Sequence, residues 1–143
     1  LDFTQIDFII EGVKVSFFSK QQHLSPVNKP VVILNNLKVA DINAIAAMKV
    51  ELITRRSTFR DYYDIYAILK ENILLKEIIT AASKHSNYLL KTRDALNFLS
   101  NGSNYKTEKD FHLLQPKYNV NNKDIEAFIK EIIIKEYSIN NQP

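Results

Sequence analysis

One lysine and two aspartates are the residues of this sequence whose types and spacing could do chemistry together. Lys49 lies near the middle of an apolar stripe at helical spacing, and Asp61 and Asp64 lie toward the packing side of the next predicted helix. The stripe consists of Ile42, Ile45, Ala46, Leu52 and Ile53. Because desolvation of an unpaired ammonium group is unfavourable by several kcal/mol or removes its proton, Lys49 is expected to have an acidic partner.

The two helices that must position these side chains are predicted between residues 41 and 70, joined by a short turn at residues 57–59. So short a connection favours antiparallel neighbours. At ~1.5 Å of rise per residue, Lys49 and Asp64 differ by roughly 5 Å in distance from the turn, which a lysine side chain can span. Arg56 lies nearer the turn, within easy reach of the first aspartate.

Each of these residues also has a purely structural interpretation. The lysine and the aspartates could form an ion-pair cluster that fixes a helical hairpin, because shifted charges indicate a functional site only statistically. Asp61 could instead cap the start of the second helix. Arg56 and Arg60 could bind phosphate groups, whereas Arg55 points away from the stripe and is expected at a solvated helix end.

Aromatic side chains surround the second aspartate and could stack on a base, although packing is the more common role of such tyrosines. The three are Tyr62, Tyr63 and Tyr66. The three histidines are scattered over different predicted elements, without the spacing of metal ligands.

Composition narrows the classes of protein that the sequence fits. The net charge is only +3, from 19 basic and 16 acidic residues, which argues against a dedicated nucleic-acid binder with a concentrated basic face. The absence of cysteine excludes disulfides and thiolate chemistry and fits a reducing cytoplasm. No run approaches the ~20 apolar residues of a membrane span, and neither a phosphate-binding loop nor a nucleophile elbow occurs.

The arrangement of apolar residues predicts an α+β fold with a short N-terminal hairpin or small sheet, followed by a bundle of about five helices. Residues 3–10 and 13–18 alternate at period two around Glu11-Gly12, which is typical of a hairpin, and the apolar run 31–34 is expected to add a strand. Helical spacing continues over about 74–83, 87–99 and 124–137. We therefore expect strands in residues 1–36 and a helical domain in residues 37–143.

Two segments of the helical hairpin, from Asp41 to Lys49 and from Arg60 to Tyr66, resemble the C-terminal motifs of a known family, the AbiEii/AbiGii-type nucleotidyltransferase toxins, which resemble DNA-polymerase-β-like enzymes. The stretch from Asp41-Ile42 to Met48-Lys49 is similar to a motif with an acidic residue, a short apolar stretch and a lysine. The second motif is Arg-Asp-x-x-Asp followed by an apolar-aromatic pair, matched by Arg60, Asp61, Asp64, Ile65 and Tyr66.

The resemblance implies an enzyme that transfers a nucleotide from an NTP, with Mg²⁺, to an RNA such as tRNA or to a protein, in a toxin–antitoxin system that acts in abortive infection. It implies catalytic roles for Lys49 and for Asp64 or Asp61, to which the phosphate binding considered above for Arg56 and Arg60 would be added. The family's Gly/Ser-Arg motif and metal-binding Asp-x-Asp pair have no match here. The chain is therefore expected to be a C-terminal portion that binds no Mg²⁺ and does not catalyse alone; the alternative is a non-catalytic helical module that binds an antitoxin or RNA.

Overall fold

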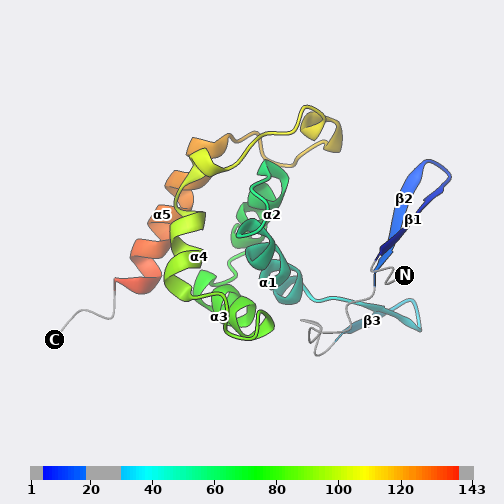
Figure 1. The fold of residues 1–143 in the computed structure, drawn as a ribbon, viewed down its shortest axis with the longest axis horizontal. Helices are drawn as coiled ribbons and strands as arrows, with labels where there is room; N and C mark the ends of the chain where they lie inside the picture. Colours follow the sequence, from blue (N-terminus) through cyan, green and yellow to red (C-terminus); the bar gives the residue numbers. More distant parts are fainter. Residues whose placement is uncertain (1–4, 19–29, 139–143) are drawn as a thin grey trace.

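The computed structural model describes residues 5–18 and 30–138 and contains two small antiparallel sheets followed by a bundle of helices. The predicted α+β fold class is confirmed. Figure 1 shows the helices gathered together and the two hairpins lying apart from them, beyond α1. The first two residues of the predicted first strand lie outside the described part of the chain. The elements are β1 (Gln5–Ile10), β2 (Val13–Phe18), β3 (Val31–Ile33), β4 (Leu37–Val39), α1 (Ile42–Ile53), α2 (Phe59–Leu69), α3 (Leu75–His85), α4 (Thr92–Leu99), the 3₁₀ turns η1 (Gly102–Asn104) and η2 (Phe111–Leu114), and α5 (Asn122–Tyr137).

The N-terminal hairpin forms where the alternating pattern predicts it. Strands β1 and β2 pair antiparallel around Glu11 and Gly12, which both have positive φ angles, of 50° and 80°. A two-residue hairpin turn of this kind requires positive φ at both positions, and glycine adopts it without a steric penalty. The predicted third strand also exists, but it does not join this sheet. It pairs instead with β4, in a second hairpin.

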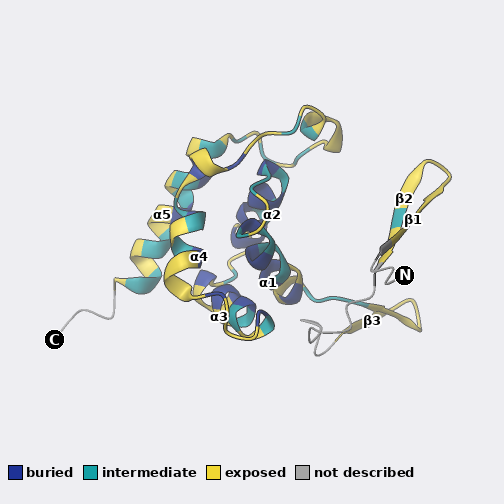
Figure 2. Cartoon of the chain, in the orientation of Figure 1, coloured by how far each residue is buried: buried dark blue, intermediate teal, exposed yellow. Residues whose placement is uncertain are grey.

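Both hairpins expose much of their apolar surface, as the yellow strands of Figure 2 show. Phe8 and Phe17 contact each other edge to face, with ring centroids 5.8 Å apart, yet remain 49% and 61% exposed. In the second hairpin Val32 and Leu37 are also at least half exposed. An isolated two-stranded hairpin is marginally stable, so the stable core of the described chain lies in the helices.

The helices α1 and α2 form the hairpin predicted from residues 41–70, and each begins at a side-chain cap. The Asp41 carboxylate accepts a hydrogen bond from the backbone N–H of Ala44, at 2.8 Å, and Thr58 caps α2 in the same way. Such caps satisfy N–H groups that the first helical turn leaves free. The two helices therefore begin close to the residues at which the sequence predicts them to begin.

The buried face of α1 differs from the predicted stripe. Ala46, Ala47, Val50 and Ile53 are almost fully buried, whereas Ile42 and Ile45 are 44% and 39% exposed. Both isoleucines lie in the first turn of α1, next to the segment that connects this helix to the exposed hairpins. The prediction that Lys49 sits in the middle of a buried stripe is therefore wrong: it lies at the border between the core and an exposed apolar strip.

The core of the bundle is centred on α2. The fully buried Tyr62 stacks on Tyr105, with ring centroids 4.0 Å apart, and its hydroxyl donates to the carbonyl of Leu99 at 2.8 Å. These contacts fix both α4 and the segment after it against α2. Residues from α1, α3 and α5 complete the core, including Leu75, Ile78, Ile79, Ile125 and Ile129.

A carboxylate from α5 caps the N-terminus of α3. Leu74, the residue before this helix, makes no side-chain cap, but the Glu136 carboxylate accepts from the backbone N–H groups of Leu75 and Lys76 at 3.0 and 2.7 Å. A negative charge at a helix start satisfies free donors and the helix dipole. Glu136 therefore supplies from a distance the cap that the local sequence lacks.

Several predictions for the second half of the chain need correction. The helix predicted from residue 87 begins only at Thr92, and Leu89, predicted to be in the core, is 78% exposed. Of the four anchors predicted after the Ser100–Asn104 break, Phe111 and Tyr118 pack on the core, but Leu113 and Leu114 are 69% and 53% exposed. The 3₁₀ turn η2, which contains both leucines, buries none of its residues, and no periodicity in the sequence indicates this.

Within the described residues, the helices are too short or too polar to span a bilayer.

Candidate functional site

The turn between α1 and α2 is held by main-chain hydrogen bonds to a distant segment. The N–H of Phe59 donates to the carbonyl of Lys106 at 3.0 Å, and the N–H of Lys106 donates to the carbonyl of Ser57 at 3.1 Å. Because these bonds close on both sides of Thr58, the start of α2 has a fixed direction. The turn therefore places the first residues of α2 reproducibly against the end of α1.

Lys49 contacts both aspartates of α2. Its ammonium Nζ lies 2.8 Å from Oδ1 of Asp61 and 2.5 Å from Oδ2 of Asp64. The predicted pairing of a lysine on the first helix with acids on the second is therefore present in the structure. The Lys49 side chain is 22% exposed and that of Asp64 39%, whereas Asp61 is 1% exposed. The cluster thus has a buried inner carboxylate and a solvent-accessible outer side.

Asp61 is the centre of the cluster. Besides Lys49, its carboxylate accepts two hydrogen bonds from the guanidinium of Arg56, at 2.8 and 3.2 Å, and one from the hydroxyl of Thr58 at 2.8 Å. The Thr58 hydroxyl also accepts from the N–H of Asp61, at 3.4 Å. The side chain that caps α2 is therefore Thr58 and not Asp61, whose carboxylate contacts the hydroxyl of the cap and belongs to the ion-pair cluster.

Thr58 is a member of this network that the motif-based predictions did not include. The sequence contains a signal for it, because Thr58-Phe59-Arg60-Asp61 has the Thr-x-x-Asp spacing of a helix start.

The charges of the cluster shift the pKa values of its two inner members in opposite directions. Burial alone would lower the pKa of the Lys49 ammonium, but hydrogen bonds and charges from Asp61 and Asp64 outweigh it and raise that pKa above 10.5. Burial would raise the pKa of Asp61, but the hydrogen bonds from Lys49, Arg56 and Thr58 outweigh it and hold the pKa below 3.8. Both groups are therefore charged at neutral pH.

The other arginines near the turn pair with acids outside the cluster. Arg60 faces a different side of α2, where its backbone N–H donates to Glu108 at 3.3 Å and its guanidinium lies 3.5 Å from Asp110. Arg55, predicted at a solvated helix end, is 54% exposed but pairs with the buried Glu51 of α1. The structure therefore brings together Lys49, Asp61, Asp64 and Arg56, and places Arg60 apart from them.

Glu51 belongs to a second buried pair that sequence reasoning missed. Its carboxylate lies 3.1 Å from Nε2 of His85 at the end of α3, and both side chains are less than a tenth exposed. The two residues are far apart in the sequence and match no motif, so only the tertiary structure reveals the contact.

The tyrosines next to Asp64 are packing residues. Tyr62, Tyr63 and Tyr66 are 0%, 7% and 7% exposed, and their rings contact other aromatic rings of the core. The more common role, packing, is the one that they have.

The described residues do not form a site that fits Mg²⁺. A divalent cation of this kind takes oxygen ligands, usually carboxylates that are free to bind it. Both oxygens of Asp61 already accept hydrogen bonds, and Asp64 contacts the ammonium of Lys49. In residues 5–18 and 30–138, no three acidic, histidine or cysteine side chains converge as metal ligands. Any metal chemistry must therefore come from groups other than this cluster.

No curated protein and no solved structure gives a significant match. One protein-family model, described as "Nucleotidyl transferase AbiEii toxin, Type IV TA system", matches residues 6–137. That match includes both hairpins, the ion-pair cluster and all five α-helices. The chain belongs to the AbiEii nucleotidyl transferase toxin family.

Proposed function

We propose that this chain is the C-terminal, phosphate-handling part of a cytoplasmic nucleotidyltransferase toxin that transfers a nucleotide from an NTP to an RNA or protein acceptor. The observation that carries the proposal is the position of Lys49, whose charged ammonium is fixed by two carboxylates and still reaches solvent. Membership of a nucleotidyltransferase family supports it. The pairing of such a toxin with a cognate antitoxin is part of the same proposal.

In this proposal Lys49 and Arg56 bind the phosphate groups. Arg56 is 57% exposed and is held through its contacts with Asp61, so its remaining N–H groups can reach a ligand. A phosphate oxygen would replace Asp64 at Lys49, while Asp61 keeps the ammonium in place. Fixed positive charge at a developing negative charge is a large contribution to catalysis of phosphoryl transfer. Arg60 could assist only by leaving Glu108 and Asp110, so we rank Arg56 ahead of it.

Asp61 and Asp64 have different tasks in this proposal. Asp61 is buried and fully engaged, so it positions Lys49 and Arg56 and does not exchange protons with a substrate. Asp64 is 39% exposed and makes one ion pair, so its carboxylate can either orient Lys49 or accept a proton from an acceptor hydroxyl. We expect no transfer by these 143 residues alone, because the sequence has no Asp-x-Asp pair and the cluster does not fit a metal ion.

A second function is favoured by the neutrality of the cluster. Lys49 and Arg56 are balanced by Asp61 and Asp64, so the four side chains need no ligand to be satisfied. The helical bundle would then be a non-catalytic module for an antitoxin or RNA partner, in which the ions only fix the geometry.

The two functions are separated by Lys49→Ala in the intact toxin, expressed in a host whose growth it arrests. We expect the variant to lose toxicity at unchanged protein level, whereas Lys84→Ala, at an exposed lysine of α3, keeps it. Thermal melts of both purified variants would report folding. A folded Lys49→Ala variant that still arrests growth would exclude a catalytic role for Lys49 and favour the binding module.

A further inference from the structure

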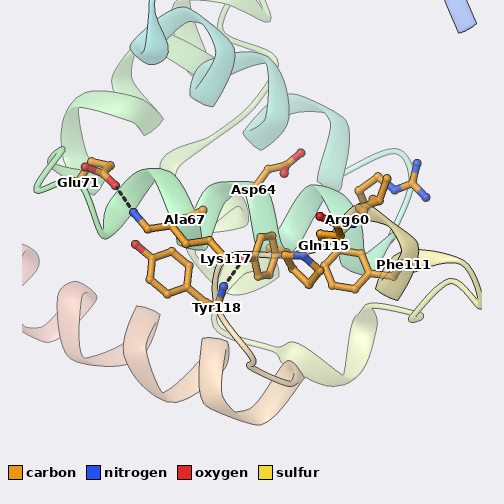
Figure 3. A pocket seen from close by; sticks show the side chains of 11 residues that line it. Arg60, Asp64, Ala67, Glu71, Phe111, Gln115, Lys117 and Tyr118 are labelled. Carbon is orange, nitrogen blue, oxygen red and sulfur yellow. Dashed lines mark hydrogen bonds and ion pairs between the residues drawn. The ribbon is translucent and has the colours of Figure 1, made fainter. Parts of the chain in front are cut away.

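A groove of about 280 Å³ runs along α2, next to the ion-pair cluster. One wall is the exposed edge of α2, and the other is the segment from Phe111 to Tyr118 (Figure 3). Asp64 lies on the α2 wall, and its carboxylate reaches across to Lys49 on α1 at 2.5 Å. The groove and the cluster therefore share a side chain, and a single ligand can touch both.

The segment that forms the second wall is held firmly in place. The N–H of Tyr118 donates to the hydroxyl of Tyr63 at 2.8 Å, and the ring of Phe111 packs edge-on against the ring of Tyr63 at 5.2 Å. Tyr118 also packs on the ring of Tyr66, with centroids 5.5 Å apart. With both ends of the segment fixed on α2, the groove is a preformed feature of the fold.

The floor of the groove is apolar and the rim is polar. Ala67, Phe111 and Leu114 contribute apolar surface, while Glu71 and Lys117 face each other across the rim at 3.4 Å. The other two charged side chains of the lining already have partners outside the groove, since Asp64 pairs with Lys49 and Arg60 pairs with Glu108 and Asp110. A balanced rim over an apolar floor suits a flat heterocycle with polar edges better than it suits a free anion.

We propose that this groove binds the base of a nucleotide and favours bases with an exocyclic amino group. The inference rests on the proposed function, because a nucleotide is the ligand that joins a flat heterocycle to the phosphates that Lys49 and Arg56 would bind. Carboxylates only accept hydrogen bonds, and adenine, cytosine and guanine carry an amino group that donates to them, whereas uracil has none. The base could belong to the donor NTP or to the acceptor RNA.

The test measures the affinity of the 143-residue chain for ATP, CTP, GTP, UTP, inorganic tripolyphosphate and the trinucleotide ApApA by titration calorimetry. We expect the amino-bearing NTPs to bind about tenfold or more tightly than tripolyphosphate, since base stacking and edge contacts are absent from the latter. UTP should bind more weakly than the other three. If the groove binds a base of the acceptor RNA instead, ApApA should bind, and the NTPs should bind no more tightly than tripolyphosphate.

Two variants connect the affinity to the groove. Ala67→Trp fills the groove. The matched control is Ala81→Trp, at an alanine of α3 that is also partly buried. Leu114→Asp places a charge in the lining of the groove at a position that is 53% exposed, so it tests the groove even if Ala67→Trp fails to fold. Both groove variants should lose the preference of the protein for base-containing ligands and keep its affinity for tripolyphosphate.

Each outcome decides between the groove and the cluster. Groove variants that bind every ligand as the unmodified chain does would overturn the groove proposal, even if Lys49→Ala abolishes binding. If Lys49→Ala binds tripolyphosphate as tightly as the unmodified chain does, the proposed role of Lys49 is overturned. The groove proposal still stands in that case if Ala67→Trp loses base binding. A chain that binds none of the ligands would contradict both.

Discussion

Replacing the two aspartates of the cluster by asparagine should separate a residue that supports the fold from one that is available for chemistry. Asparagine keeps the shape of the side chain and removes its charge. Asp61→Asn leaves Lys49 and Arg56 without their buried partner, whereas Asp64→Asn removes one partly exposed ion pair of Lys49. The two substitutions are therefore the same chemical change at positions that differ in burial and in the number of partners.

The expected magnitudes follow from that burial. Removal of one partner from a buried ion pair destabilises a protein by ~3–5 kcal/mol. Asp61 is 1% exposed, but Arg56 is 57% exposed and can be hydrated again, so we expect about 3 kcal/mol, at the lower end of the range. Asp64 is 39% exposed, and pairs of this kind contribute ~0–1 kcal/mol. The difference between the two variants should be at least about 2 kcal/mol.

Thermal unfolding followed by circular dichroism measures this difference. A domain of this size loses about 3–4 °C in melting temperature per kcal/mol. We therefore expect a fall of about 10 °C for Asp61→Asn and of at most about 4 °C for Asp64→Asn. Equal melting temperatures in the two variants would refute the assignment of Asp61 as the inner support of the cluster. In a toxicity assay, full activity in both would remove the two aspartates from the site.

Two further predictions follow from the same side chains. Because the pKa of Asp61 is lowered in the folded state, the charge of Asp61 stabilises the fold above pH 3.8, and this stabilisation is lost as the pH falls through the folded pKa. In urea unfolding, the stability of Asp61→Asn should therefore depend less on pH in this window than that of the unmodified chain. Glu136→Gln should destabilise the chain by about 1 kcal/mol because it weakens the cap of α3, while Glu131→Gln, at an exposed position of the same helix, should leave the melting temperature unchanged. A flat pH profile in the unmodified chain, or equal effects of the two glutamine variants, would contradict these expectations.

Local sequence was sufficient to predict the elements that carry the site. The helical spacing on both sides of residues 57–59 predicts two helices joined by a short turn, and the geometry of a helical hairpin then brings Lys49 to the aspartates. The prediction for α1 was less accurate on its buried face. Hydropathy identifies Ile42 and Ile45 as apolar, but only the position of α3 against α1 decides that the smaller Ala46 and Ala47 face the core.

Contacts between segments that are distant in the chain could not be predicted from the sequence. The sequence suggests phosphate binding for Arg60, because it cannot show that Arg60 pairs with Glu108 and Asp110. That pairing depends on the loop after α4, which returns to α2. The buried pair of Glu51 and His85 likewise requires the packing of two helices. The groove has the same origin, because no periodic pattern indicates that residues 111–118 lie along α2.

The main-chain pairing of the α1–α2 turn with Lys106 limits how the two regions can vary. Ser57 and Phe59 are joined to position 106 through peptide groups alone, so the side chain there can change without loss of either bond. Proline is the exception, since it has no N–H to donate to Ser57. The side chains of residues 107–118, which include the groove wall from Phe111 to Tyr118, can therefore vary while these main-chain bonds hold the α1–α2 turn and the adjoining Lys49 cluster in the same arrangement.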